Sequence, residues 1–290
     1  MKMRGCLITI LIVVVTAGVV VWIMSDFQFS SKHNKIGIIE IKGTIASSQD
    51  TLKQIKDFRK DSSVKAILLR IDSPGGSVGP SQEIYEEIRR TIASKPVVAS
   101  MGSVAASGGY YIACAASHII ANPGTITGSI GVIIYFPNLR ELFDKIGYQM
   151  TTIKSGQFKD IGNPSREMTP EEKELIQTTI NETYSQFVRD VAAARNLPEE
   201  DVRKIADGRI IMGERAQSLK LVDQLGNYED AVTKAVELGK IEGEPDLVYG
   251  KKKKHSLLDI LLGSDVGDRL NDIIYDSSVF LRYQLPDLSR

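Results

Sequence analysis

PVVASMGSVAASGGYYIACAA, residues 96–116, joins three local patterns in one uninterrupted run. It opens with a valine-rich apolar segment, passes through small residues that include Ser103 and Ser107, and ends in a second apolar segment. The first segment predicts a buried strand over Pro96–Ser100, and the last can form a helix. The small residues between them allow the backbone to approach a bound molecule closely.

Two serines lie in this turn, and Ser107 is the better candidate nucleophile. Ala-Ala-Ser-Gly-Gly resembles the nucleophile elbow G-x-S-x-G, with Ala105 in place of the first glycine. At the start of a helix, Ser107 would be followed by the free N–H of Gly108, in the positive field of the helix dipole. Such a donor stabilises an oxyanion. Ser103 has no following glycine and is interpreted as a strand-end residue.

Three glycine-rich clusters each follow a predicted strand. They are DSPGGSV at 72–78, ASGG at 106–109 and GTITGSIG at 124–131. Ligands of α/β proteins bind beyond the carboxyl ends of the strands, so three clusters together favour a binding or catalytic site there. None matches G-x-x-x-x-G-K-[ST] or G-x-G-x-x-G, and a nucleotide site is therefore not indicated.

Strand and helix patterns alternate along the remaining chain. The predicted strands are Ile36–Ile41, Ala66–Ile71, Pro96–Ser100, His118–Ala121, Ser129–Ile134 and Gln149–Ile153. The predicted helices are 80–92, Asn138–Ile146, 170–196, Glu199–Ala206, Gly213–Leu219 and Glu229–Gly239. This alternation predicts an α/β fold with a largely parallel sheet.

The composition excludes several classes of function. The chain of 290 residues carries 36 basic and 36 acidic residues, so nothing in its charge indicates a nucleic-acid partner. Its two cysteines, Cys6 and Cys114, lie in unrelated segments and are not expected to pair. His33, His118 and His255 are far apart, and the sequence predicts neither a metal site nor a cofactor.

The N-terminus carries an uncharged apolar segment, Cys6–Met24. Its length is close to the roughly 20 residues that cross a bilayer as a helix. Lys2 and Arg4 precede it, which favours a cytoplasmic N-terminus. A cleaved signal peptide would have a shorter apolar region and an A-x-A-like site. We therefore expect an uncleaved anchor, with the rest of the chain outside the cytoplasm.

A catalytic serine requires a base, and the residues alone leave its identity open. His118 opens a strand predicted to lead away from the site, and His33 lies in the linker after the apolar segment. A lysine can replace histidine when burial lowers its pKa. Lys154 and Lys159 in TIKSGQFKDIGNPSREMT are the candidates.

Five motifs together carry a family resemblance. They are IDSPGGSV, VVASMGSVAASGGYYIACAA, TGSIGVI, IKSGQFKDIGNPSREMT and IADGRI, in this order. From about Ile36 to Gly239 the chain resembles the short, single-module form of the signal peptide peptidase A family, membrane-anchored serine proteases with a Ser–Lys dyad. Asp72 stands where that family more often has asparagine. The resemblance implies a Clp protease/crotonase-like α/β fold with repeated β-β-α units, preceded by one N-terminal transmembrane helix.

The resemblance also implies roles for particular residues. It places the nucleophile at Ser107, the general base at Lys159, a serine that hydrogen-bonds the lysine at Ser129, and the oxyanion donors at the backbone of Gly76 and Gly108. One copy of the chain is expected to hold the whole dyad. The implied substrates are remnant signal peptides and other unfolded peptides, and the implied assembly is a ring- or dome-like homo-oligomer.

The predicted organisation has five parts: a cytoplasmic N-terminus (1–5), a transmembrane anchor (6–24), a linker (25–34), a catalytic peptidase domain (35–240) and a basic, amphipathic tail (241–290). Three roles stay open for the tail. The three alternatives are packing as a helix, contact with anionic lipid through Lys251–Lys254, and entry into the active site as a pseudo-product. The rival functions are a crotonase-type acyl-CoA hydratase or isomerase and a non-catalytic membrane scaffold.

Overall fold

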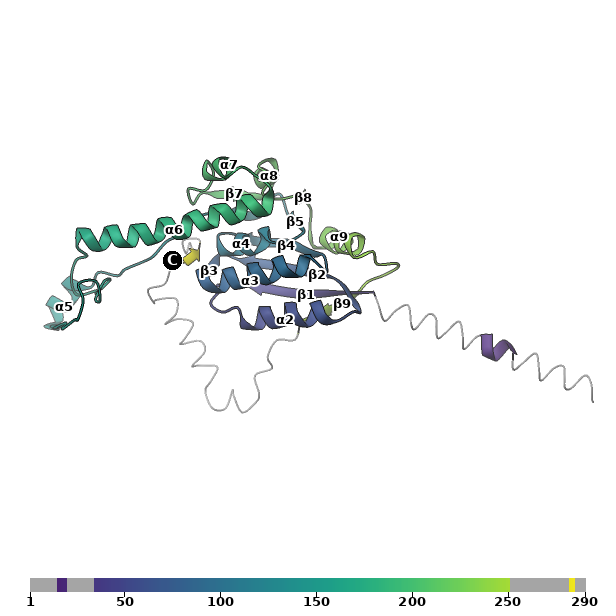
Figure 1. The fold of residues 1–290 in the computed structure, drawn as a ribbon, viewed down its shortest axis with the longest axis horizontal. Helices are drawn as coiled ribbons and strands as arrows, with labels where there is room; N and C mark the ends of the chain where they lie inside the picture. The colour runs from purple at the N-terminus through teal and green to yellow at the C-terminus, as the bar shows by residue number, and fades with distance from the viewer. Residues whose placement is uncertain (1–14, 20–33, 251–281, 285–290) are drawn as a thin grey trace, which may run out of the picture.

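The computed structural model describes residues 15–19, 34–250 and 282–284. Figure 1 shows a body built on a central sheet, and an arm that carries α5 beyond the far end of the long helix α6. The elements follow in the order β1 (Lys35–Lys42), α2 (Gln49–Lys60), β2 (Val64–Ser73), β3 (Gly75–Ser77), α3 (Val78–Ile92), β4 (Val97–Ala105), α4 (Gly108–Cys114), β5 (His118–Ala121), β6 (Ile126–Gly128), α5 (Arg140–Ile146), α6 (Pro170–Arg195), α7 (Glu199–Arg203), β7 (Ile210–Met212), α8 (Gly213–Ser218), β8 (Gln224–Leu225), α9 (Tyr228–Gly239), β9 (Asp246–Tyr249) and β10 (Arg282–Gln284).

The central sheet of the described chain has eight strands, with the path β7-β6-β4-β2-β1-β9, while β5 pairs with β4 and β8. Neighbours β1, β2, β4 and β5 are parallel, which confirms the predicted α/β class. The carboxyl ends of parallel strands share one edge, so the turns after β2 and β4 meet there. Two units, β2-β3-α3 and β5-β6-α5, have the expected β-β-α order.

Both faces of the sheet are buried, which explains why its strands read as continuous apolar runs. Along β2, Ile67 and Leu69 pack with residues of α2, α3, α4 and α6 on one face. Ala66 and Leu68 alternate with them and pack against α9 on the other. The two-residue period of a strand sends neighbouring side chains to opposite layers.

Two predicted strands are wrong. Only a single bridge residue interrupts the irregular chain over Ser129–Ile134, and the strand lies three residues earlier, at β6. Gln149–Ile153 lies in the arm without regular structure, and Ile153 is 96% exposed. β-branched residues favour a strand, but a strand also requires a neighbour to pair with. Helix α2 was not among the predicted helices; its sequence is mostly polar, and only Ile55 and Phe58 are buried.

The predicted anchor lies mainly outside the described residues, as do the segments 1–5 and 25–33. Residues 15–19 are helical. Within the described ranges, no helix combines the length and the apolar character that a membrane crossing requires. The tail predicted from 241 begins inside the sheet, because β9 pairs with β1.

Helix α6 begins with the cap that its sequence predicts. The Thr169 side chain accepts from Glu172 N–H, the Glu172 carboxylate accepts from Thr169 N–H, and Pro170 is the first helical residue. Phe187, Val188 and Val191 in its second half are buried in the core. Its first half extends past the body and carries the arm (Figure 1).

The capping box predicts the local stability of this extended half. Thr169→Ala removes the side-chain acceptor, a loss of about 1 kcal/mol for a helix N-cap. We expect amide exchange in the first turns of α6 to accelerate about fivefold, measured by hydrogen–deuterium exchange. Thr178→Ala is the control, because the Thr178 hydroxyl donates only to the Glu174 carbonyl within the same helix. Equal exchange in the two variants would contradict the capping role.

Candidate active site

Ser107 occupies the turn between β4 and α4 in a strained backbone conformation. Its φ is 54° and its ψ is −116°, a region that side-chain-bearing residues rarely adopt. Two backbone hydrogen bonds hold the turn, from Ser107 N–H to Gly128 O at 2.8 Å and from Ala106 N–H to Ser73 O at 3.1 Å. The turn therefore bridges the ends of three strands at the carboxyl edge.

The Ser107 hydroxyl is buried, and its Oγ has no hydrogen-bond partner among the described residues. A buried polar group without a partner is costly, so native structures rarely keep one without a functional reason. Strain and an unpaired hydroxyl at the same residue keep Ser107 the candidate nucleophile. Ser103, the alternative, lies inside β4 with an exposed side chain.

Helix α4 begins directly after Ser107. Gly109 N–H donates to Ala106 O and Tyr111 N–H to Ser107 O, whereas the structure gives Gly108 N–H no backbone acceptor outside the helix. Among the described residues, Gly108 therefore has a backbone N–H available beside the candidate nucleophile. Cys114, at the other end of α4, is not an alternative nucleophile, because burial raises the pKa of its thiol to about 12.

Gly76 lies at the centre of β3, which contacts α4. Ile45 N–H donates to Gly75 O and Ser77 N–H donates to Ile45 O. Backbone groups alternate along a strand, so the N–H and C=O of Gly76 face the opposite edge. That edge pairs antiparallel with β10, with Tyr283 directly opposite Gly76. The predicted oxyanion donor thus faces an edge that an extended peptide segment can join.

Ser73 connects β3 to the nucleophile turn. Its hydroxyl donates to Gly43 O at 2.6 Å and accepts from Gly75 N–H at 3.1 Å, and its carbonyl accepts from Ala106. Its neighbour Asp72 accepts from Val104 N–H at 3.0 Å. Among the described residues, the Asp72 side chain acts only as an acceptor for this backbone N–H. An aspartate can therefore fill this position as well as an asparagine.

Ser129 follows Gly128, the acceptor of the Ser107 N–H. It is buried, has a φ of 49°, and its N–H donates to Arg209 O. It also lines a cavity of about 400 Å³ whose other walls are Gly131, Val132, Ile133, Tyr135, Ile180, Asn181, Tyr184, Ala206, Asp207 and Gly208. Ser129 therefore lies near the nucleophile turn and beside a mostly apolar pocket.

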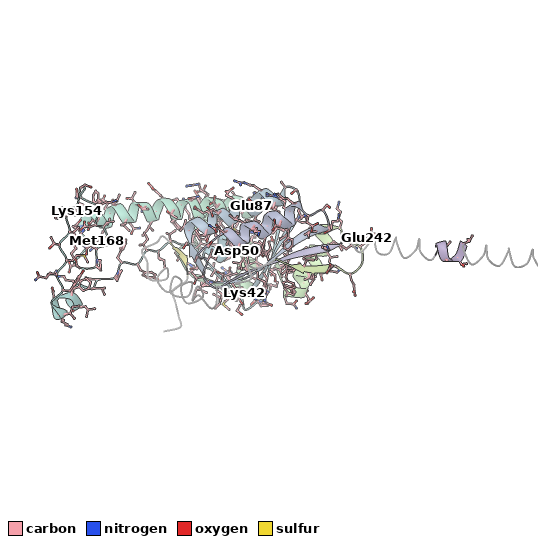
Figure 2. All side chains as sticks on the ribbon, turned by 90° about the horizontal axis from the view of Figure 1, so that it is seen from below. Lys42, Asp50, Glu87, Lys154, Met168 and Glu242 are labelled. Atoms are coloured by element: carbon pink, nitrogen blue, oxygen red, sulfur yellow. The ribbon has the colours of Figure 1, made fainter. Side chains whose placement is uncertain are left out.

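The structure does not bring Lys159 to Ser107 within one chain. Figure 2 shows Lys154 and Met168, which flank this lysine in sequence, at the outer end of the arm, away from the body where Asp50 lies. Lys159 is exposed, and Ser107 Oγ has no partner in the described chain. Within the described residues, Ser107 Oγ and Lys159 are therefore not paired in one copy, and the predicted dyad stays a prediction.

The two candidate lysines differ in their surroundings. Lys154 Nζ donates to Asp160 Oδ1 at 2.5 Å and to Gln157 O at 2.9 Å. Within the described ranges, the structure pairs Lys159 Nζ with no such group. Of the two lysines, Lys159 is the one whose amine has no hydrogen-bond partner among the described residues.

His118 does not supply the base. It opens β5 opposite Val98, near the amino end of β4, whereas Ser107 follows the carboxyl end. Its Nδ1 lies 3.9 Å from an Asp223 carboxylate oxygen. His33 and His255 lie outside the described residues.

Comparisons with known proteins agree with this geometry. A sequence model of peptidase family S49 matches residues 89–242, and one of Clp protease matches residues 27–125. "Putative protease slr0021" of Synechocystis sp. is 48% identical over 221 residues, which cover 76% of this chain and 79% of that protein. "Protease 4" of Salmonella typhi is 39% identical over 217 residues, which cover 71% of this chain and 35% of that protein. "Putative signal peptide peptidase SppA" of Enterococcus faecium is 37% identical over 216 residues, covering 70% and 63%.

The fold and the strained serine turn therefore define a serine peptidase with a Clp protease-like α/β architecture. The chain belongs to peptidase family S49, the signal peptide peptidase A family. These matches favour peptide hydrolysis over the acyl-CoA chemistry of a crotonase-type enzyme and over a non-catalytic scaffold.

The packing around Gly76 predicts a strong effect of a single methyl group. A Cβ at Gly76 would lie 2.3 Å from the Ile45 carbonyl oxygen, so β3 has to shift in Gly76→Ala. We expect peptide cleavage to fall by about 10²-fold or more, as after loss of one oxyanion donor. Gly79→Ala is the control, since nothing lies within 4 Å of its Cβ position. Comparable activity of the two alanine variants would exclude β3 from the site.

Proposed function

We propose that the protein is an endopeptidase in which Ser107 attacks the peptide carbonyl and Lys159 acts as general base. The buried Ser107 hydroxyl without a partner carries this proposal, because it leaves room for a base that the isolated chain does not supply. Lys159 is supported by the family resemblance and by its exposure on the arm. The backbone N–H groups of Gly76 and Gly108 are proposed as oxyanion donors, and Ser129 as the group that orients the lysine amine.

The dyad is proposed to form between neighbouring copies. The arm holds Lys159 away from the Ser107 of its own chain, so a second copy has to bring the two together. The arm also exposes many large apolar side chains: Tyr135, Leu139, Leu142, Ile146, Tyr148, Met150, Ile153 and Phe158. So many exposed large apolar side chains in one segment are typical of a protein–protein interface. The resulting ring- or dome-like homo-oligomer would cover this surface and complete each site.

The proposed reaction proceeds through an acyl-enzyme. Neutral Lys159 accepts the Ser107 proton as Oγ attacks the carbonyl carbon, and the N–H groups of Gly76 and Gly108 stabilise the oxyanion. The lysine ammonium then protonates the departing amine as the C–N bond breaks. Water, deprotonated by Lys159, hydrolyses the ester and releases the Ser107 hydroxyl. Contact with the neighbouring copy would remove the Lys159 amine from water and thereby favour its neutral form.

The edge of β3 suggests how a substrate is bound. Segment Arg282–Gln284 pairs with Gly75–Ser77, which shows that this edge accepts an extended strand. We propose that substrate peptides add to β3 in the same antiparallel way, with a side chain in the cavity beside Ser129. Main-chain pairing requires an unfolded segment, and this supports remnant signal peptides and other unfolded peptides as substrates. The proposed location is the outer face of the cell membrane, anchored through 6–24.

The proposed dyad is tested by mixing two inactive variants. Ser107→Ala and Lys159→Ala are each expected to lose peptide cleavage, because either change removes a reacting group. When folded copies are mixed and allowed to exchange, roughly a quarter of the sites in a random assembly would join an intact serine to an intact lysine. Cleavage of a fluorogenic peptide measures the recovery.

Labelling with a serine-directed phosphonate separates the outcomes of this experiment. Wild type is expected to be labelled at Ser107, Ser107→Ala to remain unlabelled, and Lys159→Ala to react slowly. Normal turnover by Lys159→Ala would refute the dyad. Two inactive variants that show no recovery in a verified mixed oligomer would refute its assembly between copies.

The pairing of β10 with β3 favours the pseudo-product role among the three left open for the tail. Removal of residues 282–290 is expected to increase the cleavage rate of short peptides several-fold at low substrate concentration, because the β3 edge becomes free. Removal of 285–290 alone leaves β10 in place and is the matched control. Equal rates for the two truncations would show that β10 does not compete with substrate.

A further inference from the structure

An arginine joins the loop of Lys159 to the start of α6. The Arg166 guanidinium donates to both carboxylate oxygens of Asp160, at 3.2 and 3.0 Å, and to both of Glu172, at 2.5 and 2.8 Å. It also donates to the carbonyls of Asp160 and Glu167. Asp160 follows Lys159 directly in sequence, and Glu172 belongs to the capping box of α6.

We propose that Arg166 is a positioning residue for Lys159, fixing its loop to the rigid start of α6 and occupying the neighbouring Asp160 carboxylate. This inference rests on the proposed role of Lys159 as the base. Arg166 itself contacts neither substrate nor Ser107 in this proposal; it acts through the loop.

The geometry of the pairs makes this connection strong. Bidentate guanidinium–carboxylate contacts combine charge with two aligned hydrogen bonds, and Arg166 makes two of them. Glu172 is only 2% exposed and Asp160 only 12% by side chain, so water screens the pairs less than at an open surface. The pairing holds the pKa of Glu172 down at about 2 and lowers that of Asp160 well below its usual range.

Without Arg166, the loop around Lys159 keeps few hydrogen bonds that would hold it in place. Lys159 N–H donates to Gly156 O and Ile161 N–H to Phe158 O, both at 3.2 Å, which are bonds of single turns. The ion pair of Lys154 with Asp160 lies within the same loop and does not connect it to a helix. Arg166 is therefore the described contact that transmits the rigidity of α6 to Lys159.

Besides holding the loop in place, Arg166 changes the electrostatic surroundings of Lys159. A general base has to be neutral before it accepts a proton, and a free carboxylate beside a lysine favours the charged ammonium. The described groups facing Asp160 are the cations Lys154 and Arg166, with the anion Glu172 bound to the same guanidinium. Glu167 and Lys173 line the adjacent cavity. With both cations on Asp160, its carboxylate is occupied and does not pair with Lys159.

Arg166→Gln tests both consequences in the full-length oligomer. We expect amide exchange over 154–161 to rise about tenfold, and kcat for a short peptide to fall about 10²-fold with little change in KM. The acidic limb of the kcat profile should move to higher pH, because a free carboxylate beside a lysine base favours the charged ammonium. Arg90→Gln is the matched control, because Arg90 is an exposed arginine on α3 that pairs with Glu87, and Glu87 keeps Arg59 as a second partner.

Asp160→Asn and the double variant Arg166→Gln/Asp160→Asn separate positioning from folding. The double variant should return the acidic limb to its wild-type position, because no carboxylate remains beside Lys159, while the loop still exchanges fast. Unchanged exchange and an unchanged pH profile in folded Arg166→Gln would overturn the proposal. So would a profile that stays shifted in the double variant. Activity retained by Lys159→Ala would instead refute the base itself, and the exchange of the loop reports on Arg166 independently of that result.

Discussion

The site depends on two backbone hydrogen bonds that hold the serine turn between its neighbours. Ala106 donates to Ser73 and Ser107 donates to Gly128, so one turn is fixed to the ends of both adjacent strands. This constraint keeps Ser107 at a positive φ and directs its hydroxyl into a buried position without a partner. The sheet behind it is buried on both faces, and its packing can support the local strain.

The arm is stabilised differently from the body. Its inner end is joined to α6 by the charge pairs of Arg166, while its surface exposes large apolar side chains. The body can therefore fold around its own core, whereas the arm keeps exposed apolar side chains that we propose a neighbouring copy covers. Placing the nucleophile on the body and the proposed base on the arm would make catalysis depend on assembly, because an isolated copy would present only half of the dyad.

Much of the body could be predicted from local pattern. The continuous apolar runs of β1, β2, β4 and β5 predicted a parallel sheet, and Thr169 with Pro170 predicted the start of α6. Predictions failed where pairing partners decide the outcome. Ser129–Ile134 has the composition of a strand but only one bridge residue, and the three-residue strand β6 is shorter than any periodic signal. Strand β3 pairs with Ile45 and with β10, which are both remote from it in sequence.

The sequence by itself determined the candidate nucleophile, Ser107, because a small-residue turn between an apolar strand and a helix is a local pattern. It reduced the base to Lys154 or Lys159, and family resemblance was needed to choose between them. Only the tertiary structure decided that Lys154 is bound to Asp160, that Lys154 and Met168, which flank Lys159 in sequence, lie on the arm, and that the edge of β3 pairs with Arg282–Gln284. These are relations between segments far apart in the chain or between a segment and the body. They are set by packing and charge pairing in three dimensions, which no local pattern of residues records.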